Sequence, residues 1–169
     1  MAYLEKNNYR TNIDREEHRK WVNSIIKENS DLQYYQATLT FKQRKYESGQ
    51  YLQIKYDIEK IMKRFISRLN REVFGNAAYR HKKRIFSYVS IEHGAYEDNT
   101  HAHLILGFPS DRVYKKNIMT LIRELIAKIP MINKRNEVGI LQTDIDLKNW
   151  LNYILKKGFN PLLMKSPKY

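Results

Sequence analysis

The stretch that decides the fold is IFSYVSIEHGAYEDNTHAHLILGF, residues 85–108. Residues 85–92 and 102–108 have the composition of strands, and the polar residues 93–100 between them make a hairpin the simplest connection. Matching apolar to apolar positions pairs Ile91 with Ala102 and therefore Glu92 with His101. A slip of one residue would turn the charged Glu92 into the core, so the pattern predicts one register.

Two histidines of this hairpin share a face with that glutamate. His101 and His103 are two residues apart in a strand, so both side chains leave the same face, while Ala102 and Leu104 leave the other. Two imidazoles and one carboxylate, here Glu92, can bind a divalent metal. The alternative is a pair of solvated histidines on a strand, and no HExxH helix supports a zinc hydrolase.

The segments around the hairpin predict a single α+β domain over residues 1–169. Residues 34–41 alternate as a strand and residues 138–143 form another, while apolar stripes of helical period predict four helices. We expect a mainly antiparallel sheet with helices on one face, and we expect its polar other face to be open. Residues 1–13 and 159–169 are expected to be loose ends. The predicted helices cover residues 14–29 with Asp14 as N-cap, 54–73, 111–129, and 147–157 with Asp146 as N-cap.

The charge of the chain indicates a polyanionic partner. Its 169 residues include 31 Lys and Arg against 18 Asp and Glu, a net charge of +13. The absence of cysteine excludes disulfides and a Cys nucleophile. We expect neither a secretory leader nor a membrane span, because no apolar run approaches the ~20 residues needed. The charge alone is compatible with nucleic acid or with an anionic membrane surface.

Several basic clusters are candidate nucleic-acid contacts, although each could equally be an ordinary solvated face. One cluster follows the first strand, a second precedes residues 85–92, and a third lies on the 54–73 helix. Thr38 and Thr40 are added because they lie on the polar face of the first strand. The assigned DNA contacts are Thr38, Thr40, Lys42, Arg44, Lys45, Lys82, Lys83 and Arg84, with the helical cluster Lys60, Lys63, Arg64, Arg68 and Arg71 held as a solvated face.

A tyrosine stands out in NWLNYILKKG, residues 149–158. On a helical wheel Tyr153 lies at the polar edge of the apolar stripe, with Lys156 and Lys157 next to it at i+3 and i+4. A phenol has a pKa near 10, and a neighbouring cation or metal favours the phenolate that a nucleophile needs. The alternative is an amphipathic tyrosine that borders the core.

Together these motifs resemble the HUH endonuclease superfamily, the initiators of rolling-circle replication and their relatives. YQATLTF is similar to its first motif, THAHLIL to its His-hydrophobe-His motif and NYILKKG to its Tyr-x-x-Lys motif. The resemblance implies an RRM-like antiparallel sheet of about five strands. It also implies Mg²⁺ or Mn²⁺ at Glu92, His101 and His103, and Tyr153 as a nucleophile that forms a 5′-phosphotyrosine. Lys156 would be the motif lysine, and Lys157 is kept beside it.

The function expected from this resemblance is sequence-specific nicking and joining of single-stranded DNA, which initiates replication of a plasmid, phage or virus. The partner would be single-stranded or hairpin origin DNA, in the cytoplasm or the host compartment where the element replicates. A host or separate helicase would supply unwinding, since no G-x-x-x-x-G-K-[ST] loop is present. The alternatives are a single-tyrosine HUH transposase, a non-enzymatic nucleic-acid-binding protein and a small metallohydrolase.

Overall fold

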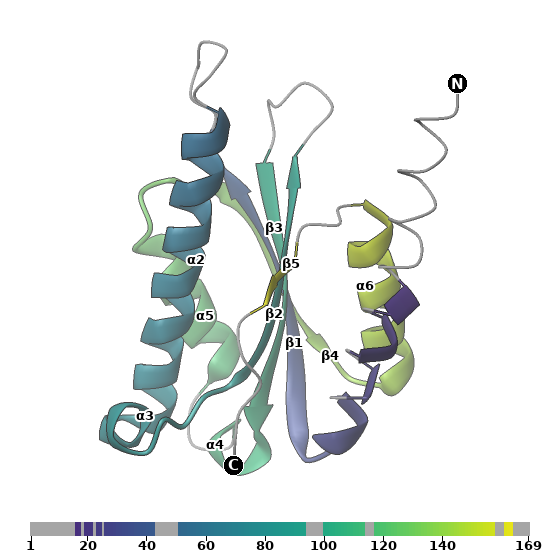
Figure 1. The fold of residues 1–169 in the computed structure, drawn as a ribbon. Coiled ribbons are helices and arrows are strands. Elements are labelled where there is room, and N and C mark those ends of the chain that lie inside the picture. Colours follow the sequence, from purple (N-terminus) through teal and green to yellow (C-terminus); the bar gives the residue numbers. More distant parts are fainter. Residues whose placement is uncertain are drawn as a thin grey trace.

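The computed structural model describes residues 16–17, 19–21, 23–24, 26–42, 51–93, 100–113, 117–157 and 161–163, without the side chains of 51–56, 93, 156–157 and 161–163. An antiparallel five-stranded sheet in the order β4-β1-β3-β2-β5 forms its centre. Helices flank this sheet on both sides (Figure 1). The predicted α+β class with an antiparallel sheet of about five strands is therefore confirmed.

The elements have the following bounds. The strands are β1 Leu32–Phe41, β2 Phe86–His93, β3 Thr100–Pro109, β4 Ile132–Leu141 and β5 Pro161–Leu163. The helices are α2 Tyr51–Phe74, α3 Asn76–Arg80, α4 Ser110–Val113, α5 Ile118–Ala127 and α6 Asp144–Lys157. The described residues between 16 and 28 are also helical.

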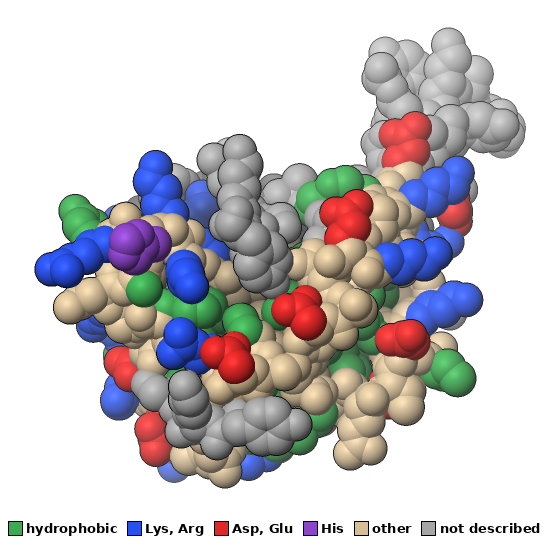
Figure 2. Space-filling view, turned by 90° about the horizontal axis from the view of Figure 1, so that it is seen from below, with side chains coloured by type: hydrophobic (Ala, Val, Ile, Leu, Met, Phe, Trp, Pro, Cys, Tyr) green, Lys and Arg blue, Asp and Glu red, His purple; other side chains and the backbone are tan. Residues whose placement is uncertain are grey.

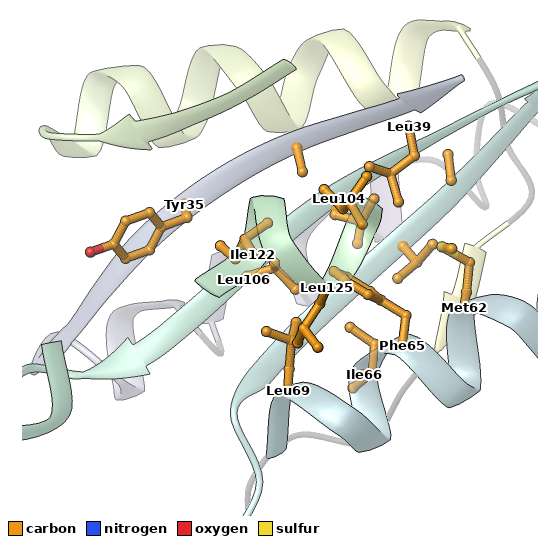
Figure 3. Packing of buried hydrophobic residues seen from close by; sticks show 14 of the residues in the cluster. Tyr35, Leu39, Met62, Phe65, Ile66, Leu69, Leu104, Leu106, Ile122 and Leu125 are labelled. Atoms are coloured by element: carbon orange, nitrogen blue, oxygen red, sulfur yellow. The ribbon is translucent and has the colours of Figure 1, made fainter. Parts of the chain in front are cut away.

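The larger core lies between the sheet and the pair α2 and α5. The apolar stripe of α2 places Met62, Phe65 and Leu69 against the sheet, and α5 adds Ile122 and Leu125. Figure 3 shows these side chains converging on Leu39, Leu104 and Leu106 of the central strands. Burial of this stripe is what the helical period of the sequence predicted.

The second face of the sheet is covered in part, so the expectation of an open face was wrong for the covered part. Tyr34, Phe86, Tyr88 and Ile105 project from this face and are buried under Leu147, Leu151, Ile154 and Leu155 of α6. Large apolar side chains at one end of the strands require this cover, because their exposure would be unfavourable. The part of the face that carries the polar residues of β1, β2 and β3 borders a cavity instead.

Three local expectations differ from the structure. The helix predicted over 111–129 is divided into α4 and α5, because Asn117 caps α5 by accepting a hydrogen bond from the Thr120 amide. Asp146 is not the N-cap of α6. Instead, the Thr143 hydroxyl accepts from the Asp146 amide and the Asp146 carboxylate accepts from the Thr143 amide, which is a capping box.

The tail after Gly158 is not wholly loose, since residues 161–163 form β5 beside β2. Residues 1–15, including the expected cap Asp14, lie outside the described part of the chain. Within the described residues, no helix combines the length and the apolar character that crossing a bilayer requires.

Candidate active site

The polar cluster predicted from the hairpin is assembled at one end of the sheet. β2 and β3 pair Ile91 with Ala102 and Glu92 with His101, so the predicted register is confirmed. On the other side of β3, β1 pairs Thr38 with His103 and Thr40 with His101. Cross-strand partners share a face, so three neighbouring strands present their polar side chains to one place.

Each histidine ring is held through its Nδ1 atom by a threonine of β1. The Thr38 hydroxyl lies 3.2 Å from His103 Nδ1, and the Thr40 hydroxyl lies 3.1 Å from His101 Nδ1. A hydroxyl can donate or accept, so it can satisfy Nδ1 in either tautomer of the ring. These contacts engage Nδ1 of both rings and leave Nε2 as the nitrogen for other partners.

His103 and Glu92 form a direct contact that bears on metal binding. His103 Nε2 lies 2.9 Å from Glu92 Oε2, and the two side chains are 4% and 19% exposed. In an octahedral site, two neighbouring ligand atoms make an angle of about 90° at the ion. With bonds of about 2.1 Å, these two atoms are about 3.0 Å apart. The spacing of this pair therefore already suits two ligands of one Mg²⁺ or Mn²⁺.

His101 stands farther from this pair than a shared ion requires. The ring centroids of His101 and His103 are 6.2 Å apart. Among the described residues, no three His, Asp or Glu side chains are gathered closely enough to form a metal site as they stand. The donor set fits a divalent metal in its chemistry and strand placement, and His101 would have to turn toward the other two to complete it.

Helix α6 positions a tyrosine beside the histidines. Leu151, Ile154 and Leu155 hold the helix on the sheet. Trp150 adds a directional contact, because its indole N–H donates to the main-chain oxygen of Leu104 on β3 at 3.1 Å. The Trp150 ring stacks on the Tyr153 ring, with centroids 5.3 Å apart and planes at 16°.

The Tyr153 ring meets the His103 ring edge-on. Their centroids are 5.5 Å apart and their planes lie at 90°. Tyr153, Glu92, His101 and His103 line one open cavity of about 600 Å³. Residues separated by about 50 positions in the sequence thus share one surface, as the motif analysis predicted.

Among the tyrosines whose side chains are described, Tyr153 is the one that is exposed and also lies in the cavity with the two histidines. Its side chain is 40% exposed, whereas Tyr34, Tyr35 and Tyr88 are buried. Burial raises the pKa of Tyr35 and of Tyr88, which opposes formation of a phenolate at either residue. Tyr79 is 90% exposed but belongs to α3, at the opposite end of the sheet from Glu92 (Figure 1).

The predicted DNA contacts fall in different places. Thr38 and Thr40 line the cavity and hold the histidines. Lys42 is exposed at the end of β1 and lines a second cavity. Arg44 and Lys45 lie outside the described residues, as do the side chains of Lys156 and Lys157 at the end of α6.

The cluster Lys82, Lys83 and Arg84 is far from the histidines. It precedes β2, and the six residue steps from Phe86 to Glu92 span about 20 Å of strand. Arg84 also serves the local fold, because its guanidinium donates to the main-chain oxygens of Ala78 and Lys83. Figure 2 views the end of the molecule with α3 and α4 and shows acidic side chains among the basic ones. This end is therefore not a uniformly basic surface.

Sequence reasoning missed four residues that line the histidine cavity. Lys134, Arg135, Asn136 and Glu137 all belong to β4, whose strand was predicted to begin only at residue 138. Their signal in the sequence is weak, because NKRNE, residues 133–137, reads as a polar turn. Only its pairing with β1 reveals this segment as part of the sheet.

Comparison with protein-family models, with curated proteins and with solved structures gave no match. The interpretation of the cavity therefore rests on its residues and their geometry.

Proposed function

We propose that this chain is a metal-dependent endonuclease of the HUH type, which nicks and rejoins single-stranded DNA through a tyrosine and initiates rolling-circle replication. The observation that supports this most strongly is the 5.5 Å contact between the Tyr153 and His103 rings. It places an exposed phenol, the candidate nucleophile, beside the candidate metal ligands. The net charge of +13 supports a polyanionic substrate.

The reaction would be a transesterification at phosphorus. Tyr153 Oη attacks the scissile phosphate, the bond from phosphorus to the 3′-oxygen breaks, and the proton lost by the phenol is balanced by the one gained by the 3′-hydroxyl. A bound Mg²⁺ or Mn²⁺ would supply positive charge to the phosphate oxygens. Because one ester replaces another, a later 3′-hydroxyl can reverse the step without ATP.

The residues around Tyr153 would hold it in position for attack. Trp150 supports one side of the phenol ring and is itself bonded to Leu104. Thr38 and Thr40 would keep Nε2 of each histidine available to the metal through their contacts to Nδ1. Such preorganisation is worth most in a site that holds its groups rigidly.

Formation of a covalent adduct tests the proposal. The probe is a pool of single-stranded oligonucleotides with a randomised centre and a 3′ label, since a 5′-phosphotyrosine retains the 3′ portion of the strand. We expect a labelled band that survives SDS with Mn²⁺, disappears with EDTA and is absent from Tyr153→Phe. If wild-type protein binds the pool but forms no adduct in Mn²⁺ or Mg²⁺, a non-enzymatic binding protein replaces this proposal.

The structure bears on one of the alternatives with the same chemistry. Tyr153 contacts His103 of its own chain, so a single chain brings the tyrosine and the histidines together. This arrangement favours a replication initiator over a transposase that exchanges its tyrosine helix between two subunits.

A further inference from the structure

β4 carries an irregularity at the edge of the sheet. Its pairing with β1 passes from Leu39–Asn136 to Phe41–Ile132, so two more residues lie on β4 than on β1 in this interval. The Asn136 side chain closes the gap, because it accepts from the Thr40 amide at 3.3 Å and donates to the Asn133 main-chain oxygen. The irregularity is thus a bulge with its own hydrogen bonds.

The bulge presents two cations at consecutive positions. A regular strand would direct Lys134 and Arg135 to opposite faces of the sheet. Here both are exposed. Both also line the cavity that contains His101, His103 and Tyr153. They face two carboxylates there, Glu92 and Glu137, so this cavity alone is not a purely cationic site.

A second cavity lies beside the bulge. It has a volume of about 710 Å³ and shares Lys134 and Asn136 with the first. Lys42 and Arg123 add two more cations, and no Asp or Glu occurs among its described lining residues. Ile126 and Ile129 give it an apolar wall.

The two cavities lie on opposite sides of the sheet edge. The first is lined by α6, which covers one face, and the second by α5, which covers the other (Figure 1). β4 is the edge strand between them. A ligand that occupies both must bend around this edge, which a single strand can do and a duplex with a persistence length of about 50 nm resists.

We propose that the β4 bulge is a backbone clamp for single-stranded DNA. Lys134 and Arg135 bind phosphates at the histidine cavity, and the strand continues around the sheet edge into the second cavity beside Lys42. The inference rests on the proposed function for the identity of the ligand, but it requires only binding and no cleavage.

The test measures binding of a twelve-nucleotide oligothymidylate in EDTA, where no metal-dependent cleavage occurs, at several salt concentrations. Each lost phosphate contact should make the log–log salt slope shallower by about 0.7. For the double variant Lys134→Ala/Arg135→Ala, we therefore expect a slope that is shallower than that of wild type by about 1.4. Raising the salt from 50 to 200 mM should then reduce the affinity of wild type by about sevenfold more than that of the variant. For Lys42→Ala, we expect a slope that is shallower by about 0.7.

The matched control is Lys63→Ala/Arg64→Ala, which removes one Lys and one Arg from the exposed face of α2. Its slope should equal that of wild type. Equal slopes for the two double variants, an unchanged slope for Lys42→Ala, or tighter binding of a twelve-base-pair duplex would each overturn the clamp. If the bulge double variant melts below wild type, the two single variants replace it, each with an expected change of about 0.7.

The result separates this inference from the proposed function. If the bulge variant has a shallower salt dependence than wild type but wild-type protein forms no covalent adduct, the clamp is supported and the nuclease is refuted. An adduct from wild-type protein with unchanged slopes in the variants would do the reverse.

Discussion

Thr38→Val tests whether the threonines of β1 prepare the histidines for metal. Valine has nearly the shape of threonine, so the substitution removes the hydroxyl that lies 3.2 Å from His103 Nδ1 and leaves little cavity. His103 is only 3% exposed, so water cannot readily replace the lost partner. An unsatisfied buried polar group costs about 1–3 kcal/mol, and we expect the metal-free protein to lose that much stability.

Metal affinity should fall as well. With Nε2 bound to a metal, Nδ1–H would donate to the Thr38 hydroxyl, and loss of such a partner typically weakens binding about 10–100-fold. Isothermal titration with Mn²⁺ measures this change, and thermal unfolding in EDTA measures the stability. Thr38→Ser keeps the hydroxyl, so its Mn²⁺ affinity and its stability should stay close to those of wild type. Thr120→Val is the control for the substitution itself, because it replaces a threonine with valine at an exposed position of α5. The reasoning fails if Thr38→Val binds Mn²⁺ as tightly as Thr38→Ser.

Four further substitutions probe the site and the sheet that carries it. Trp150→Phe removes the hydrogen bond from the indole to a carbonyl of β3, so it should lower the stability by about 1 kcal/mol and slow adduct formation. An unchanged rate of adduct formation would show that the indole does not position Tyr153. Gly107→Ala would place a Cβ atom 2.8 Å from a ring carbon of a neighbouring tyrosine, and urea unfolding should show a loss of about 1–3 kcal/mol unless the ring moves freely. Lys156→Ala and Lys157→Ala should each slow nicking less than removal of the phenol does, and the larger effect identifies the assisting lysine.

The hairpin could be predicted because the apolar and charged positions of its two strands are compatible with only one register. The core face of β3 and the charge of Glu92 together allow one register, and the structure has that register. The placement of His101 and His103 on the same face as Glu92 followed directly. These inferences needed only the alternation of side chains along two adjacent strands.

The cover on the second sheet face was missed, although the sequence contains a signal for it. Leu104, Ile105 and Leu106 are consecutive apolar residues, and all three are buried. A strand that is apolar on both faces is typical of a sheet covered on both sides. Tyr34 and Tyr88 were harder to interpret, because a tyrosine fits a polar surface as readily as a core.

The contribution of β4 could not be inferred from local pattern. NKRNE has neither strand alternation nor apolar anchors, and its place in the sheet depends on the pairing of β4 with β1 and on the bond from the distant Thr40 amide to the Asn136 side chain. Such non-local pairing outweighs local propensity. The two cations of the bulge therefore emerged only from the three-dimensional structure.

Mapping the covalent attachment tests the central claim most directly. The adduct formed in Mn²⁺ is digested with nuclease and trypsin, and the peptides that retain a nucleotide are identified by mass spectrometry. Cleavage after Lys148 and Lys156 releases NWLNYILK, residues 149–156, in which Tyr153 is the only tyrosine. We predict that this peptide carries the nucleotide and that Tyr153→Phe yields none. A nucleotide on any other tyrosine, or an adduct that persists in Tyr153→Phe, would contradict the account.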